Sequence, residues 1–256
     1  MQWFLRFILV VSAFFMLLWL TYVLKFWAYL CVDTGQRLVE RDYELLREIE
    51  RWRFCLGRHI RVLAGFASER TCDRRLKMLK DEAKYIDKKY ILFGVPALYT
   101  LTHKGKTVIG ANHRLDKIRV DRITHDIAVL DTVTYFILKS IAEVKQITTE
   151  KQLYSKNGFS IRKHYPDFVI ETKNEKICVE LELSAKGKSK FSNNLQENFI
   201  TYDKQIWVVL TTGKKIIKQL EDHQTMYPNI EILYLEEVQN FVKLSRTESK
   251  NTKLQQ

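Results

Sequence analysis

An uncharged apolar run near the N-terminus constrains the fold of this chain more than any other feature. Residues 7–24 read FILVVSAFFMLLWLTYVL and contain no charged side chain, and apolar residues continue after Lys25. A run of this length can cross the hydrocarbon core of a bilayer as a helix, with Lys25 reaching back to the interface. Trp3 lies at one end and Tyr22 at the other, as in interfacial aromatic belts. We therefore predict a single membrane anchor within residues 1–32.

Two other interpretations of this run fit less well. A secretory signal peptide needs a small-residue cleavage site after its apolar block, and none follows a block that is already too long. A buried core helix of such uniform apolarity would need a large protein around it. Lys25, Arg37 and Arg41 follow the run and only Arg6 precedes it, so the positive-inside rule places the remainder of the chain in the cytoplasm.

The charge balance favours a polyanionic partner. The 256 residues include 42 lysines and arginines against 30 aspartates and glutamates, which gives a formal net charge of +12. Such an excess suits nucleic acid or an anionic membrane surface, and ordinary solubilising charge is the weaker explanation. The four cysteines lack the spacing of a disulfide framework or a zinc site, which fits a reducing compartment.

Residues 40–110 carry a pattern of short helices and strands. Apolar residues recur at helical spacing within residues 40–52, and Ser68 and Thr102 are suited to cap helices that follow them. A Gly-Val-Pro turn at residues 94–96 separates two β-rich runs. In chain order we expect three helices, two strands and a closing helix, at residues 40–52, 56–66, 68–86, 90–94, 96–102 and 103–110.

Three helices and a two-stranded wing resemble the winged helix-turn-helix family, and the closing LYTLTHKGKTVIG is similar to the end of a bacterial winged helix. The resemblance implies that residues 68–83 form a recognition helix whose early positions enter the major groove of double-stranded DNA. The alternative is a solvated face on a small packing or protein-binding domain. The residues implied to contact DNA are Arg70, Arg74, Arg75, Lys77, Lys104 and Lys106.

Residues 120–243 alternate between helical and strand patterns, and their order predicts an α/β fold (α+β overall) in which helices flank a mixed sheet. The continuous apolar run at residues 206–212 indicates a strand buried on both faces. The polar residues 244–256 are expected to form a disordered tail. Besides a hairpin, we expect helices at 122–143 (strongly amphipathic), 188–202 and 214–226, and strands near 151–154, at 206–212 and at 230–235.

The hairpin carries three carboxylates, on Asp167, Glu180 and Glu182. Residues 177–183 alternate with a period of two, and FVI precedes them across a polar turn. If the turn is centred on residues 174 and 175, Ile170 faces Val179, Asp167 faces Glu182, and all three carboxylates share one face. Carboxylates this close raise each other's pKa unless a cation such as Mg²⁺ lies between them. The alternative is an acidic face that points into solvent.

The order of elements resembles the core of the PD-(D/E)XK nuclease superfamily. Pro166-Asp167 matches its first motif element, and Glu180-Leu181-Glu182 matches the second, except that Glu182 occupies the place of the lysine. The resemblance implies that Asp167 and Glu180 bind Mg²⁺ and that Glu182 assists the metal or its water. Lys186, four residues further on, would stabilise developing charge in place of the missing lysine.

Together with HDIAVLDTV at residues 125–133, these resemblances make the chain similar to the bacterial replication-relaxation family, whose His-Asp helix His125, Asp126 and Asp131 match. The similarity implies a DNA-binding protein of a plasmid or other mobile element, with or without metal-dependent nicking. Such a protein would act in replication, relaxation, mobilisation or conjugative transfer, with replication or transfer proteins as partners.

The predicted location is the bacterial inner (cell) membrane, crossed once, with the soluble domains in the cytoplasm. Two alternatives stay open. One is a non-enzymatic, membrane-bound transcriptional regulator or adaptor that keeps a degenerate nuclease fold as a scaffold, which the glutamate at position 182 favours. The other is a membrane protein whose basic surface binds anionic lipid.

Overall fold

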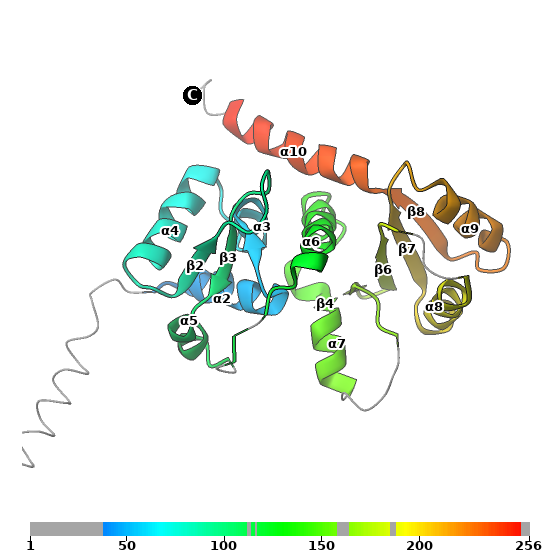
Figure 1. Ribbon diagram of the computed structural model, residues 1–256, viewed down its shortest axis with the longest axis horizontal. Coiled ribbons are helices and arrows are strands. Elements are labelled where there is room, and N and C mark those ends of the chain that lie inside the picture. The colour runs from blue at the N-terminus through cyan, green and yellow to red at the C-terminus, as the bar shows by residue number, and fades with distance from the viewer. Residues whose placement is uncertain (1–37, 112–113, 116, 158–163, 185–187, 252–256) are drawn as a thin grey trace, which may run out of the picture. The chain divides into compact units, whose positions relative to one another are not determined.

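The computed structural model describes residues 38–111, 114–115, 117–157, 164–184 and 188–251 (Figure 1). The described residues from Glu40 onward form one compact unit. The predicted membrane anchor at 1–32 lies outside the described residues. Among the residues that are described, no helix is long and apolar enough to cross a membrane.

The first part of the compact unit combines four helices with a small antiparallel sheet. The sheet has the order β1-β3-β2, and the helices lie around it (Figure 1). All four predicted helices are present, some of them shorter than expected. The elements are α2 (Glu40–Trp52), β1 (Cys55–Leu56), α3 (Gly57–Leu63), α4 (Glu69–Asp81), β2 (Ile86–Lys89), β3 (Leu98–Leu101) and α5 (His103–Val108).

Two of these helices begin at the residues that the sequence marks as caps. The hydroxyl of Ser68 accepts a hydrogen bond from the backbone amide of Thr71 at 3.2 Å, and the hydroxyl of Thr102 accepts one from Gly105 at 3.0 Å. Each bond satisfies an amide that the first turn of a helix leaves without a partner. The predicted starts of α4 and α5 are therefore confirmed.

One predicted strand of the small sheet is wrong. The expected strand at 90–94 is part of the loop between β2 and β3, and β2 lies four residues earlier. Ile86 pairs with Leu101 and fills the core, and the pairing ends where Lys89 meets Leu98. Beyond this point Tyr90 and Phe93 are exposed, and Ile91 and Leu92 are only half-buried. Hydrophobic content therefore misplaced the strand, because the register with β3 decides which residues are buried.

The second part is a five-stranded mixed sheet with the order β4-β5-β6-β7-β8. The first two pairings are antiparallel, and β6, β7 and β8 are parallel, with α8 and α9 as crossover helices. Its elements are η1 (Val120–Arg122), α6 (Ile123–Leu138), η2 (Val144–Gln146), β4 (Ile147–Thr149), α7 (Glu150–Asn157), β5 (Phe168–Glu171), β6 (Lys176–Glu182), α8 (Lys188–Thr201), β7 (Lys204–Val209), α9 (Lys214–Gln224), β8 (Ile230–Tyr234) and α10 (Leu235–Asn251).

Most predicted elements of this sheet are confirmed, and three differ. The strand expected near 151–154 is helix α7, and the strand at this edge of the sheet is β4, which precedes it. The helix expected at 122–143 ends at Leu138, followed by Ser140 in a left-handed conformation (φ 57°). It is also buried on most sides rather than amphipathic. Helix α10 continues through Asn251, into the stretch that we expected to be a disordered tail.

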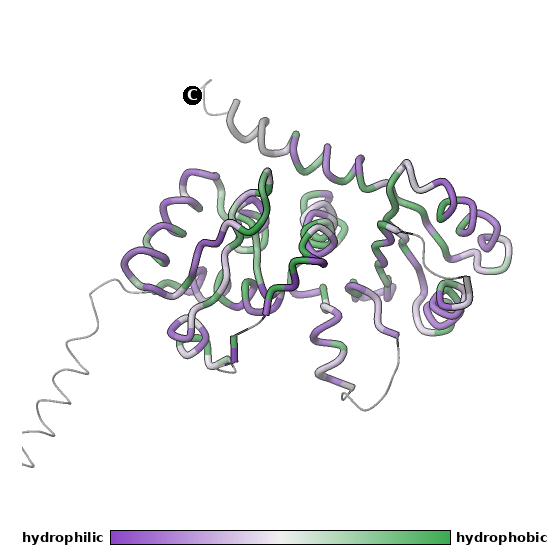
Figure 2. The backbone as a smooth tube through the Cα atoms, in the orientation of Figure 1, coloured by the Kyte–Doolittle hydropathy of each residue, from purple (hydrophilic) through white to green (hydrophobic). Residues whose placement is uncertain are grey.

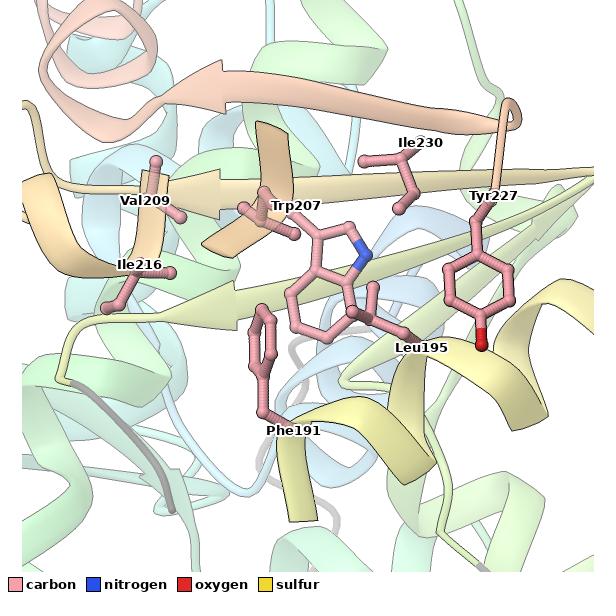
Figure 3. Packing of buried hydrophobic residues seen from close by; sticks show 8 residues of the cluster. Phe191, Leu195, Trp207, Val209, Ile216, Tyr227 and Ile230 are labelled. Carbon is pink, nitrogen blue, oxygen red and sulfur yellow. The ribbon is translucent and has the colours of Figure 1, made fainter. Parts of the chain in front are cut away.

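The core of the second sheet is built around Trp207 on β7 (Figure 3). Phe191 and Leu195 reach its indole from α8, and the ring centroids of Phe191 and Trp207 lie 5.1 Å apart. Ile216 and Leu220 complete the cluster from α9. Strands β6 and β7 are buried over nearly their whole length and are rich in hydrophobic residues (Figure 2), as expected for strands covered on both faces, whereas the edge strand β8 is half-buried.

The two parts are joined by a buried ion pair network on α6. Asp131 accepts hydrogen bonds from Arg58 Nε at 2.8 Å and Arg58 Nη2 at 3.0 Å, and its Oδ1 lies 2.8 Å from His59 Nε2. The amide of Leu56 donates to His59 Nδ1 at 3.4 Å, so Nε2 carries the proton that His59 donates to Asp131. A neutral His59 therefore satisfies both contacts. Arg58, the second residue of α3, thus fastens the first part of the compact unit to α6 of the second part.

Candidate functional site

The hairpin pairs in a different register from the one we predicted. Phe168 faces Val179 and Ile170 faces Ile177, a shift of two residues. An even shift leaves the side chains on the same faces, and continuing this register by one residue places Asp167 across from Glu180. Asp167 Oδ2 accepts a hydrogen bond from the amide of Leu181 at 2.8 Å. The carboxylates therefore share one face, as predicted, but the residue opposite Asp167 is Glu180 rather than Glu182.

The acidic face of the hairpin is buried, so the solvated-face alternative is wrong. Glu180 and Glu182 are each only 3 % exposed. Asn198 on α8 donates from Nδ2 to Glu180 Oε1 at 3.1 Å, and Nε2 of His164 forms a short hydrogen bond with the same oxygen. Burying a carboxylate is costly unless hydrogen bonds replace its hydration. These two partners supply that compensation for Glu180.

His125 on α6 joins the site from the other side of Asp167. Its Nε2 lies 3.5 Å from Asp167 Oδ1, and its Nδ1 lies 3.4 Å from Asp126 Oδ1. Burial by itself would lower the pKa of His125, but the interactions with Asp126 and Asp167 outweigh burial and raise it from 6.5 to about 10. His125 is therefore a cation at neutral pH, held between two carboxylates.

A pocket opens beside Asp167, between the end of α2, the start of α6 and the start of α7. Its polar lining combines carboxylates with cations from different elements. Burial raises the pKa of Glu150, and the charge of Asp167 raises it further, whereas Arg122 and Arg53 oppose the shift. Two carboxylates and two guanidinium groups are therefore close enough to act on one another. The main charged residues of the lining are Arg53, Arg122, Asp126, Glu150, Lys151 and Asp167.

The described residues do not fit a Mg²⁺ site of the predicted kind. Within the described ranges, no group of three or more His, Cys, Asp or Glu side chains is arranged to hold a metal ion. Asp167 Oδ2 is already bonded to a backbone amide of β6, and Glu180 Oε1 is held by His164 and Asn198. The His125 imidazolium occupies the space beside Asp167 Oδ1 where a second cation would have to bind.

The basic residues predicted to bind DNA divide into exposed and structural groups. Arg70, Arg74 and Lys77 are exposed and lie at i, i+4 and i+7 on α4, so they share one face of that helix. Arg75 points elsewhere and pairs with the fully buried Asp42 on α2, with Nε 2.6 Å from Oδ1. Arg75 therefore fastens α4 to α2.

The two lysines near α5 also differ from each other. Lys104 is exposed, and its ammonium lies 4.9 Å from the ring centroid of Tyr85. Lys106 is only 3 % exposed, donates to the carbonyl of Arg114 at 2.6 Å and lies 3.8 Å from a carboxylate oxygen of Glu50. Lys106 is thus part of the packing, and Lys104 remains available at the surface.

Lys186, the predicted substitute for the missing lysine, lies outside the described residues. The structure instead brings in residues that sequence reasoning did not select. His164 stands two residues before the Pro-Asp element, a proximity that could have identified it. Asn198 carried no such signal, because only the crossover path of α8 brings it to Glu180.

Comparisons with known proteins identify no relative of this chain. A scan of protein-family models, a search of curated proteins and a search of solved structures each found no match. The resemblances to the winged helix, PD-(D/E)XK and replication-relaxation families therefore stay predictions drawn from the sequence.

Proposed function

We propose that this chain is a DNA-binding protein tethered to the bacterial inner membrane, in which α4 contacts duplex DNA. The observation that carries the proposal is the exposed basic face of α4, formed by Arg70, Arg74 and Lys77. A helix that presents cations at this spacing suits the phosphates that line a major groove. The small sheet and capped helices around α4 support a winged helix-turn-helix arrangement. The proposed setting is replication, relaxation, mobilisation or transfer of a plasmid or other mobile element.

Duplex binding is tested with full-length protein in a mild detergent and a short fluorescent duplex. We expect Arg70→Gln/Arg74→Gln/Lys77→Gln to lower affinity by at least about tenfold, because three phosphate contacts are lost. The matched control is Lys214→Gln/Lys215→Gln/Lys218→Gln, which removes the same charge from exposed positions on α9. Equal loss in both variants would mean that net charge alone drives binding, which contradicts the proposal.

Membrane attachment is proposed from the sequence alone, through residues 7–24. A charged pair, Leu17→Arg and Leu18→Arg, would place two guanidinium groups in the middle of the apolar run, which bilayers disfavour strongly. We expect the wild-type chain to sediment with membranes through an alkaline wash and the double variant to be released. Retention of the variant on the membrane would rule out a spanning anchor at this position.

Phosphodiester cleavage is a second candidate, favoured by the position of Asp167 across from Glu180 next to a pocket lined by arginines. It is tested on supercoiled plasmid with Mg²⁺, Mn²⁺ or EDTA, beside an Asp167→Ala/Glu180→Ala variant. Metal-dependent nicking lost in the variant would establish an enzyme. We expect DNA binding without nicking, and we expect the substitutions to leave this binding unchanged. The reason is that His125, His164 and Asn198 already contact the carboxylates that would have to hold the metal. That result would leave a non-enzymatic regulator or adaptor.

A further inference from the structure

We propose that the pocket beside Asp167 binds a phosphodiester group of nucleic acid through the guanidinium groups of Arg53 and Arg122. The inference rests on the proposed function for one point, that the ligand is a nucleic acid. It adds a second contact, on a different part of the chain from α4. The pocket is lined by the end of α2, the start of α6, the end of β4, the start of α7 and Asp167, which precedes β5.

Arg53 enters the lining of the pocket from the end of α2. It directly follows the last residue of that helix and has a φ of 68°, in the left-handed region that favours glycine. A left-handed residue is a common way to end a helix, and Lys84 and Ser140 share this conformation. Glycine can therefore replace Arg53 without backbone strain, which allows the role of the side chain to be tested by itself.

Arg122 approaches the same pocket from the N-terminus of α6. It is the residue immediately before that 16-residue helix, and its side chain is half-buried. The positive end of the α6 dipole adds to the attraction for an anion at this position. The two arginines therefore come from elements about 70 residues apart in the sequence and converge on one pocket.

Arg53 and Arg122 are the cations of the pocket that have no close partner. Among the described residues, neither side chain forms a hydrogen bond or an ion pair within 4.0 Å, although both act on Glu150 at longer range. The other basic side chains of the lining are engaged, Arg51 with Glu48 at 3.1 Å and Lys151 with Glu50 at 2.8 Å. Two unengaged guanidinium groups in one pocket provide the bidentate donors that phosphate oxygens accept.

The carboxylates of the same pocket restrict the ligand to a singly charged diester. Asp126, Glu150 and Asp167 would repel a phosphate dianion, whereas a diester carries one negative charge that two guanidinium groups can neutralise. Trp52 also lines the pocket. The chemistry therefore points to an internal nucleic-acid phosphate rather than to free phosphate or a phosphorylated terminus.

The test uses the full-length protein in detergent and the dinucleotide TpT, which has one diester and no terminal phosphate. Binding is followed by ligand-observed NMR. Arg53→Gly removes the side chain and keeps the left-handed backbone, so the variant should fold with an unchanged or higher melting temperature. We expect Arg53→Gly and Arg122→Gln each to weaken TpT binding by roughly tenfold, the loss of one charge-assisted interaction. Inorganic phosphate should compete poorly.

Matched controls remove an arginine from the same elements outside this pocket. Arg47→Gln lies on α2 and Arg119→Gln three residues before Arg122, and both positions are exposed with ion-pair partners of their own. These variants should bind TpT as the wild type does. Equal affinity in all four variants, or absence of TpT binding to the wild type, overturns the inference.

The two proposals fail in different ways. Duplex binding that depends on α4, with TpT binding insensitive to Arg53 and Arg122, would overturn the pocket alone. TpT binding that requires both arginines, with no binding of duplex DNA, would support the pocket and overturn the proposed duplex contact. A loss of melting temperature in Arg122→Gln with unchanged TpT affinity would show that Arg122 only balances Glu150, which contradicts the inference.

Discussion

At the residue scale, the most informative groups are polar side chains buried with partners. Glu180, Asp131 and Asp42 are each at most 3 % exposed, and each is held by an imidazole, an amide or a guanidinium group. A buried charge of this kind is retained only when its partners replace the lost hydration. The network around Asp131, and the His125 imidazole between Asp126 and Asp167, give direct predictions.

The protonated state of His125 should make stability depend on pH. Burial opposes its protonation, yet the interactions with Asp126 and Asp167 raise its pKa to about 10, above the ordinary value of 6.5. A raised pKa in the folded state stabilises the fold fully below pH about 6.5, and the contribution is lost as the pH rises toward 10. We expect the urea midpoint to fall across this interval in the wild type and to change less in His125→Gln. The same pH dependence in both proteins would contradict this account.

Removing Asp131 should destabilise the whole chain. Burial favours its neutral form, but hydrogen bonds from His59 and Arg58 lower its pKa to about 2, so the carboxylate is ionised at neutral pH. Asp131→Ala leaves Arg58 without its buried partner, and we expect a loss of about 3–5 kcal/mol in the free energy of unfolding. Denaturant unfolding measures it. The matched control is Asp121→Ala, which removes an exposed partner of Arg119 and should change little.

At the scale of elements, sequence patterns predicted helices well and misplaced two strands. The caps at Ser68 and Thr102 are local, because each depends on residues within one helical turn. The position of β2 depends instead on pairing with Leu98–Leu101, which lies about a dozen residues further along the chain. Helix α7 was mistaken for a strand because a short polar segment carries no clear period.

The candidate site was predictable only in part. The period of two in β6 placed Glu180 and Glu182 on one face, and the structure keeps them there. Their burial could not be read from the sequence, because it depends on α8 and on His164. The pocket arginines were missed for the same reason, since α2 and α6 meet there only through the fold.

Strand β7, which lies between β6 and β8 in the second sheet, carries the large buried side chain of Trp207. β7 is parallel to both of its neighbours, and Trp207 is completely buried between α8 and α9. We expect Trp207→Ala to cost about 3–5 kcal/mol, because a large side chain leaves a cavity that the sheet cannot close. Phe199→Ala on α8 should cost clearly less, because Phe199 is 40 % exposed. Chemical denaturation followed by far-UV circular dichroism compares them, and equal losses would refute the described core.

At the scale of the whole molecule, the net charge of +12 has to be explained by its distribution. Arg58, Arg75 and Lys106 pair with buried or half-buried carboxylates, so they do not contribute to a basic surface. The exposed remainder includes the face of α4, where three cations lie along one side of a capped helix. General basicity would attract any polyanion, whereas an ordered face predicts a preferred contact.

The salt dependence of duplex binding distinguishes an ordered DNA contact on α4 from general basicity. The logarithm of the association constant falls with the logarithm of salt concentration by about 0.9 for each phosphate contacted. The α4 variant Arg70→Gln/Arg74→Gln/Lys77→Gln should therefore show a slope shallower by between two and three, estimated as about 0.9 per contact. The α9 triple variant should keep the wild-type slope. Identical slopes for all three proteins would contradict DNA binding by the face of α4.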